Sequence, residues 1–146
     1  MQPMNPYAPP AHGPPVAPAL LPHAAELEMH LVLRGAPHEL RDGLRYVLES
    51  SGWNLQWAPD GWSGMASKGN RGMYMVFGLL AMYYELRFAF QVYSDGNTGL
   101  TLYRQGSGCW GGVIGAYKTR KTFWEASRQV HAQLAQRGHV LLSRGR

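Results

Sequence analysis

The chain has 146 residues, of which 45% are hydrophobic and 16% charged, and its formal net charge is +5. This length suits one domain, and the charged fraction lies below the roughly 25% of an average soluble protein. Cys109 is the single cysteine, which excludes a disulfide within the chain. No apolar run reaches the about 20 residues of a membrane-spanning helix, and no basic start precedes an apolar segment as in a secretory signal. The expected location is therefore cytoplasmic.

The first 24 residues form a proline-rich tail. Eight of the ten prolines lie within Met1–Pro22, and no Asp, Glu, Lys or Arg precedes Glu26. This composition predicts an extended, disordered spacer. The alternative is a ligand for a proline-binding module, although no P-x-x-P with a basic flank occurs. We expect a single domain over residues 25–146.

The first half of the domain predicts a strand, a helix and a hairpin. Glu26–Arg34 alternates between apolar and polar residues, as a half-buried strand does. Pro37–Ser51 has apolar residues at helical spacing, begins with a proline and stops before a glycine. Trp53–Trp57 and Trp62–Lys68 flank the turn residues Pro59-Asp60-Gly61 and predict two paired strands. The apolar segment Met73–Met82 stays ambiguous, and we favour a short helical or irregular structure.

The second half predicts a further hairpin and a long helix. Tyr84–Tyr93 alternates strongly, and a Ser-Asp-Gly-Asn turn leads into Thr98–Gln105. A glycine-rich connection, Gly106–Gly115, precedes a helix expected over Ala116–Arg137, and His139–Leu142 would either form an edge strand or simply pack. The expected buried stripe of the helix consists of Phe123, Ser127, Val130 and Leu134.

Together these elements predict an α+β domain in the order β-α-β-β-(apolar segment)-β-β-α. Hairpins dominate, so the sheet should be mainly antiparallel and pack on the long C-terminal helix. In topology this arrangement resembles the helix-grip and TATA-binding-protein-like architectures. A resemblance of topology alone implies no particular function.

Our leading functional hypothesis is a non-catalytic binding module for an apolar small molecule or a protein partner. The chain has many aromatic residues, and its segment 73–84 is apolar and rich in methionine. We expect this segment to form the wall of an apolar groove between sheet and helix. The expected lining residues are Met73, Phe77, Leu80, Tyr84, Phe88 and Trp124.

A second hypothesis follows from the uneven charge. Residues 26–60 carry a net charge of −3 (three Arg, six Asp or Glu), whereas residues 61–146 carry +8 (eleven Lys or Arg, three acids). The basic final helix, with the glycines that precede it, could bind an acidic membrane or nucleic acid. The expected anion-binding residues are Gly111, Gly112, Lys118, Arg120 and Lys121.

Other chemistry has weaker signals. Gly106, Gly108 and Gly111 spell G-x-G-x-x-G, but the chain lacks the further parallel strands of a dinucleotide-binding fold. The histidines do not cluster and no C-x-x-C occurs, so neither a metal nor another cofactor is expected. A small enzyme of the helix-grip kind stays open as a third hypothesis, with Tyr84, Glu85 and His131 as its candidate ionisable groups. A homo-oligomer is also compatible with the sequence.

Overall fold

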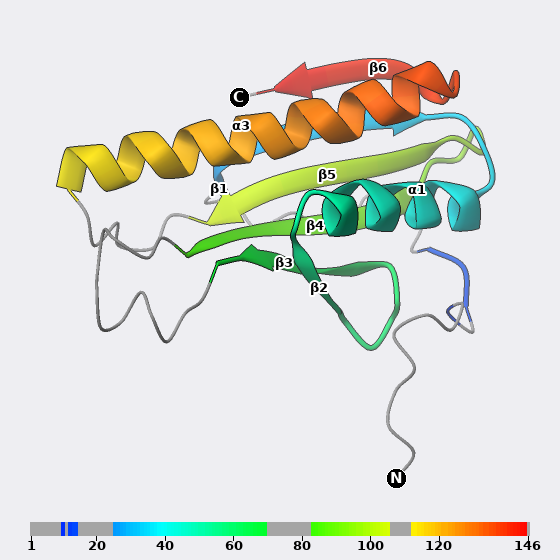
Figure 1. The fold of residues 1–146 in the computed structure, drawn as a ribbon. Coiled ribbons are helices and arrows are strands. Elements are labelled where there is room, and N and C mark those ends of the chain that lie inside the picture. Colours follow the sequence, from blue (N-terminus) through cyan, green and yellow to red (C-terminus); the bar gives the residue numbers. More distant parts are fainter. Residues whose placement is uncertain (1–9, 11, 15–24, 70–82, 106–111, 146) are drawn as a thin grey trace, which may run out of the picture.

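The computed structural model describes residues 10, 12–14, 25–69, 83–105 and 112–145. Over these ranges the chain folds as β1 (Ala25–Leu33), α1 (Pro37–Ser50), β2 (Asn54–Trp57), β3 (Ser63–Lys68), β4 (Tyr84–Val92), β5 (Thr98–Gln105), α3 (Gly112–Gln136) and β6 (Val140–Gly145). The expected α+β fold, with an antiparallel sheet packed against the C-terminal helix, is confirmed (Figure 1). The segment Met73–Met82 lies outside the described residues.

The six strands form one sheet in the order β2-β3-β4-β5-β1-β6, and every neighbouring pair is antiparallel. Strands β2 to β5 follow one another as hairpin-like neighbours. Strand β1 lies between β5 and β6, so the first strand of the domain is an interior strand. Because β6 pairs with β1, the end of the chain is a sheet edge.

Both helices cover the same face of this sheet and lie side by side (Figure 1). Gly43 of α1 permits their close approach, because a methyl group built on it would lie 3.3 Å from Cδ2 of Leu134 in α3. The expected stripe of α3, Phe123, Ser127, Val130 and Leu134, is buried as expected. Neither of the two described helices, α1 and α3, covers the opposite face, and in this sense we call it the helix-free face.

Helix α3 begins at Gly112, four residues before the expected start at Ala116. The expectation treated Gly112–Gly115 as part of a loop, because glycine disfavours a helix by roughly 1 kcal/mol relative to alanine. Once a helix is nucleated, each added residue gains a backbone hydrogen bond. In a helix of 25 residues this propagation evidently outweighs the penalty of two glycines.

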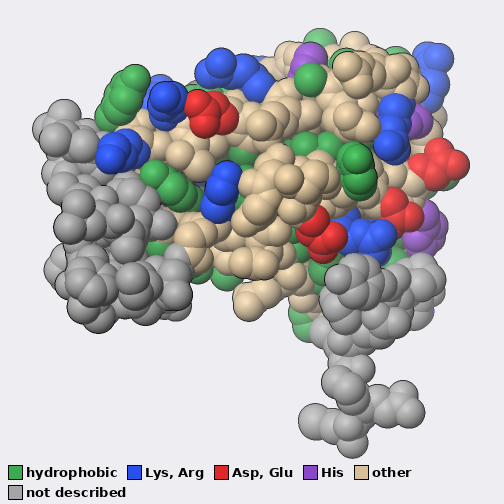
Figure 2. Space-filling view, viewed as in Figure 1, with side chains coloured by type: hydrophobic (Ala, Val, Ile, Leu, Met, Phe, Trp, Pro, Cys, Tyr) green, Lys and Arg blue, Asp and Glu red, His purple; other side chains and the backbone are tan. Residues whose placement is uncertain are grey.

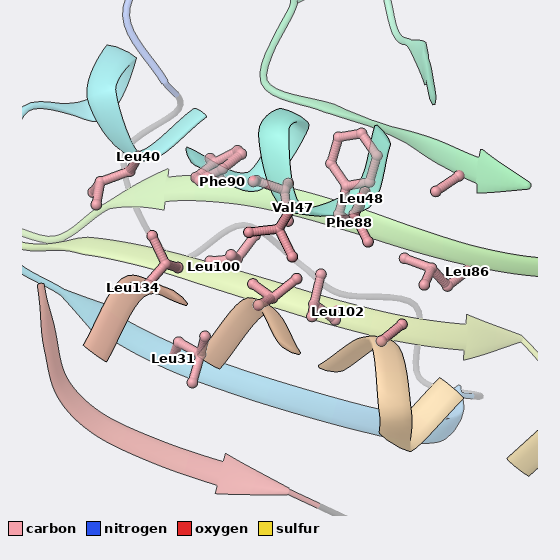
Figure 3. Close-up of a cluster of buried hydrophobic side chains, with 14 of the residues drawn as sticks. Leu31, Leu40, Val47, Leu48, Leu86, Phe88, Phe90, Leu100, Leu102 and Leu134 are labelled. Atoms are coloured by element: carbon pink, nitrogen blue, oxygen red, sulfur yellow. The ribbon is translucent and has the colours of Figure 1, made fainter. Parts of the chain in front are cut away.

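The core lies between the helices and the sheet (Figure 3). Phe88 and Phe90 of β4 are at most 1% exposed and point towards the two helices. Strand alternation and helical periodicity therefore agree on one interior. The leucines buried around them include Leu31, Leu40, Leu44, Leu48, Leu86, Leu100, Leu102 and Leu134.

The C-terminal segment forms a true edge strand, β6, rather than simply packing as a loop. It runs to Gly145, which is three residues beyond the segment expected from the sequence. Gly145 lies beneath Trp124 of α3, because a methyl group there would come within 2.9 Å of the indole ring. Leu141 and Leu142 of β6 are exposed. Among the described helices, none is long and apolar enough to cross a membrane.

Candidate functional site

Two clusters of polar and aromatic side chains stand out from the core packing. The first lies where the β2–β3 turn meets the amino end of α1. It comprises His38, Arg41, Asp60, Gly61 and Trp62, and we call it the aromatic corner. The second lies on the helix-free face, around His30.

The turn of the aromatic corner is built by Asp60. Its carboxylate accepts hydrogen bonds from the backbone N–H groups of Trp62, at 2.9 Å, and Ser63, at 3.2 Å. This is the usual way in which an aspartate closes a turn on the residues that follow it. Gly61 has a φ of +73°, a conformation that glycine adopts without steric cost. The sequence Pro59-Asp60-Gly61 therefore sets the position of Trp62.

Arg41 joins this turn to α1. Its side chain is only 4% exposed, and its Nε donates a hydrogen bond to the carbonyl oxygen of Gly61 at 2.9 Å. The guanidinium also lies over the indole of Trp57, 4.0 Å from the ring centroid, at cation–π distance. Burial lowers the pKa of Arg41, but an arginine keeps its charge in a protein.

Trp62 is held from both sides by rings. Its ring centroid lies 5.2 Å from that of His38 and 6.1 Å from that of Phe90, in edge-on arrangements. Such geometries are the favoured ones for aromatic pairs. The side chain is 1% exposed. Its position is thus fixed by α1, by β4 and by the turn at Asp60.

A piece of the proline-rich tail lies against this corner. The indole Nε1 of Trp62 donates a hydrogen bond to the backbone carbonyl of His12 at 2.6 Å. Pro10 lies directly on Gly61, where an added methyl group would come within 2.6 Å of the proline Cβ. In Figure 1 the described tail residues lie beside the amino end of α1. The corner therefore holds an extended segment through one hydrogen bond and one proline contact.

The second cluster connects three strands on the helix-free face. His30 of β1 lies between Thr101 of β5 and Tyr93, the residue that follows β4. Its Nδ1 lies 2.9 Å from Oγ1 of Thr101, and its Nε2 lies 2.5 Å from the Tyr93 hydroxyl. Gln91 donates a hydrogen bond from Nε2 to the same hydroxyl at 3.1 Å. We call these four residues the tyrosine–histidine cluster.

The donors around Tyr93 favour one arrangement of the protons. Because the oxygen of Tyr93 accepts from Gln91, its own proton is available for Nε2 of His30. Nε2 is then the unprotonated nitrogen, and Nδ1 carries the proton towards Thr101. This is the neutral imidazole. Burial lowers the pKa of His30, and this effect is larger than the raising effect of Glu28. The lowered pKa also favours the neutral imidazole.

Gly99 makes room for this cluster. A glycine inside a strand is unfavourable, and here its φ is not positive. A methyl group on Gly99 would lie 2.9 Å from the Tyr93 hydroxyl oxygen and 3.0 Å from Cγ of Gln91. The glycine therefore serves close approach of the two side chains rather than a special backbone conformation.

Only part of the expected apolar site lies within the described residues. Met73, Phe77 and Leu80 lie outside the described residues. Phe88 lies in the core against Trp57, with 4.9 Å between ring centroids. Tyr84 and Trp124 are half-buried at the margin of that core and lie on β4 and α3.

The expected anion-binding residues are also split. Gly111 lies outside the described residues, and Gly112 is the first residue of α3. Lys118, Arg120 and Lys121 are all exposed on α3, and Figure 2 shows basic side chains along the upper part of the view, over this helix. Lys121 lies 3.9 Å from Glu125. Their solvent exposure is compatible with a contact to an anionic surface.

The three candidate groups of the enzyme hypothesis lie on two elements, β4 and α3. Tyr84 and Glu85 are neighbours on β4 and so point to opposite faces of the sheet, and Glu85 accepts a hydrogen bond from Tyr83 at 2.9 Å. His131 lies on α3, half-buried. Within the described part of the chain, no three His, Cys, Asp or Glu residues come together as a metal site would require.

Comparisons with known proteins add no family. No model of a known protein family matches the chain. A search of curated proteins found no significant match either.

Sequence reasoning missed both clusters because their members are far apart in the chain. Trp62 meets a tail residue 50 positions earlier, and Tyr93 meets His30 across 63 positions. Two local signals existed. Asp60-Gly61 marks a turn that presents a tryptophan, and Gly99 interrupts an otherwise favourable strand. Neither signal names the partner segment, which only the topology of the sheet brings close.

Proposed function

We propose that this domain is a non-catalytic binding module that takes an extended, proline-containing segment of a protein partner at the aromatic corner. The observation that carries the proposal is the hydrogen bond from Trp62 Nε1 to the carbonyl of His12, with Pro10 packed on Gly61. Domains that recognise proline-rich segments use aromatic side chains in this way, because an extended proline-rich chain loses little entropy on binding.

The geometry defines what the partner segment must offer. A proline ring fits against Gly61, where no side chain intervenes, and a backbone carbonyl two residues later meets the indole N–H. A backbone carbonyl is present at every residue, so specificity rests on the proline. The preferred partner segment therefore has a proline followed, two positions on, by a residue with an exposed side chain, as His12 has.

The chain's own tail can reach this corner. Ten residues separate Pro14 from Ala25, and an extended chain of that length spans about 35 Å. Trp62 lies just before the start of β3, three strand positions from β1 in the sheet, and is level with Leu31, six residues along β1 from Ala25. These separations correspond to about 14 Å across the strands and about 20 Å along them, or a diagonal of about 25 Å. The tail is thus a tethered competitor, and tethers of this kind act at effective concentrations in the millimolar range.

The test measures binding of a fluorescent peptide with the sequence of residues 6–16 to three forms of the full chain by anisotropy. Pro10→Asp weakens the tethered tail, so this variant should bind the peptide more tightly than the natural chain. The double variant Pro10→Asp, Trp62→Phe keeps an aromatic ring at position 62 but loses the indole N–H donor. It should bind the peptide about fivefold more weakly than Pro10→Asp alone. Equal affinity of the two variants would contradict the proposal.

Exposure of the basic residues of α3 favours a second candidate function, attachment to an anionic surface. Lys118, Arg120 and Lys121 are exposed, and the net charge of the chain is +5. Such binding weakens steeply with salt. Sedimentation with phosphatidylserine vesicles and anisotropy with duplex DNA distinguish the two surfaces. Replacing all three residues by glutamate should abolish whichever binding occurs, and unchanged binding would remove this candidate.

A further inference from the structure

The tyrosine–histidine cluster shares no residue with the aromatic corner. Its members lie on the helix-free face, away from the aromatic corner's helix α1. Tyr93 and His30 are each partly exposed, while Thr101 is 1% exposed. The Thr101 end of the cluster is therefore buried, whereas the two ring-bearing side chains are partly exposed.

Its geometry is that of an activated nucleophile. In enzymes that use a nucleophilic side chain, the hydroxyl lies within hydrogen-bond reach of a base, and a third group orients that base. Here the Tyr93 hydroxyl lies 2.5 Å from Nε2 of His30, and Thr101 Oγ1 lies 2.9 Å from Nδ1. Gln91 donates a further hydrogen bond to the phenolic oxygen and so holds it beside the base.

Two features of the sheet hold the cluster in place, namely a glycine at position 99 and the register of β1 and β5. Gly99 has no side chain, and this leaves room for the hydroxyl of Tyr93. A glycine inside a strand is otherwise unfavourable. The two rings are arranged in a T shape, with centroids 6.2 Å apart, and Nε2 of the imidazole meets the hydroxyl. Sheet pairing holds His30 opposite Thr101, so the base is fixed by the register of β1 and β5.

We propose that Tyr93 is a nucleophile, with His30 as its general base, that accepts an acyl group from an activated ester. The phenolic oxygen attacks the carbonyl carbon while its proton moves to Nε2 of His30. The tetrahedral intermediate then expels the alcohol or phenol, which takes that proton from His30. One C–O bond forms and one breaks, and no further reactant is required. Thr101 and Gln91 are positioning residues.

The charged groups around His30 set the pH range. Glu28 lies two residues away on the same strand face, and Arg144 of β6 pairs with His30 across the neighbouring strand. Tyr103 of β5 pairs with Glu28 on the same face. Burial lowers the pKa of His30 more than Glu28 raises it. The imidazole therefore stays neutral, and able to accept a proton, at a lower pH than an ordinary histidine. The reaction should therefore persist into mildly acidic solution.

The probe is p-nitrophenyl acetate, added to the full-length protein, with release of nitrophenol followed by absorbance and the acetylated residue located by peptide mass spectrometry. We expect Tyr93 to be acetylated ahead of Tyr117 and Tyr46, which are 66% and 62% exposed but have no described histidine partner. His30→Gln should lower the rate at Tyr93 about 100-fold, in the range of general base catalysis. Tyr117→Phe is the matched control and should leave the Tyr93 rate unchanged.

Two outcomes would overturn the proposal: acetylation of Tyr93 no faster than of Tyr117, or an unchanged rate in His30→Gln. Thr101→Val keeps the shape of the side chain and guards against a folding defect in the histidine variant. It should lower the rate at Tyr93 by a smaller factor and alter its pH profile, because the hydrogen bond on Nδ1 is lost. A purely structural role for the histidine would leave that profile unchanged.

Discussion

The guanidinium of Arg41 lies 4.0 Å from the ring centroid of Trp57 and at the same time donates a hydrogen bond to Gly61. One side chain of α1 thus fixes both the end of β2 and the turn that presents Trp62. The turn of the aromatic corner is therefore anchored to the folded core through Arg41.

Arg41→Lys should destabilise the fold by about 2 kcal/mol, because lysine keeps the charge but loses the planar contact and the Nε hydrogen bond. Urea unfolding followed by tryptophan fluorescence measures the change. Arg45→Lys is the matched control on the same helix, since Arg45 lies 3.7 Å from Asp42 in a partly exposed ion pair. Its effect should stay below about 0.5 kcal/mol.

Gly64→Ala should cost about 3 kcal/mol or more. A methyl group on Gly64 would collide with the backbone carbonyl of Gln56 and come within 2.8 Å of the ring of Phe88. Neither the paired strand nor the buried ring has free space to yield. Gly13→Ala serves as control, because nothing lies within 4 Å of the added group. Thermal unfolding should therefore separate the two variants by many degrees, and equal melting temperatures would show that β2 and β3 are not paired as described.

Ser127→Ala should raise stability by roughly 1 kcal/mol. Its hydroxyl oxygen is buried in α3 and has no hydrogen-bond partner among the described residues. Removing an unsatisfied buried hydroxyl removes a desolvation penalty, and alanine is the better helix former. The neighbouring position gives the reverse control. Ala126→Ser would bury a new hydroxyl where the side chain is 1% exposed, and should lower the free energy of unfolding.

Stability should fall as the pH drops below about 6.5, the unfolded pKa of histidine, in part because of His30. Burial lowers the pKa of His30 in the folded state, so the unfolded chain takes up its proton first. This contribution stops changing once the pH is below the folded pKa. His30→Gln should remove the corresponding part of the pH dependence. An identical slope in both proteins between neutral and mildly acidic pH would contradict the burial of this imidazole.

Much of the fold could be predicted from the sequence because local patterns agree with the tertiary structure. Strand alternation placed Leu31 and Phe88 in the core, and helical spacing placed Val130 there. The start of α3 was predicted too late because four residues that include two glycines resemble a loop. In the structure they extend a helix whose remaining length stabilises it.

The functional clusters could not be predicted in this way, because they arise from register rather than from local pattern. His30 meets Thr101 through the pairing of β1 with β5, strands separated by most of the domain. Trp62 meets His12 through a tail whose composition carries no positional signal. Alternation shows that His30 faces away from the core, but it does not show which residue lies opposite.

The contact of the tail with Trp62 can be tested directly by nuclear magnetic resonance. In uniformly labelled protein, the indole Hε1 of Trp62 should show nuclear Overhauser contacts to residues 12 and 13 and slow exchange with water. Pro10→Asp should weaken those contacts and speed the exchange while leaving the resonances of β4 and β5 in place. A Trp62 Hε1 that exchanges rapidly in the natural chain and has no contact to the tail would contradict the account.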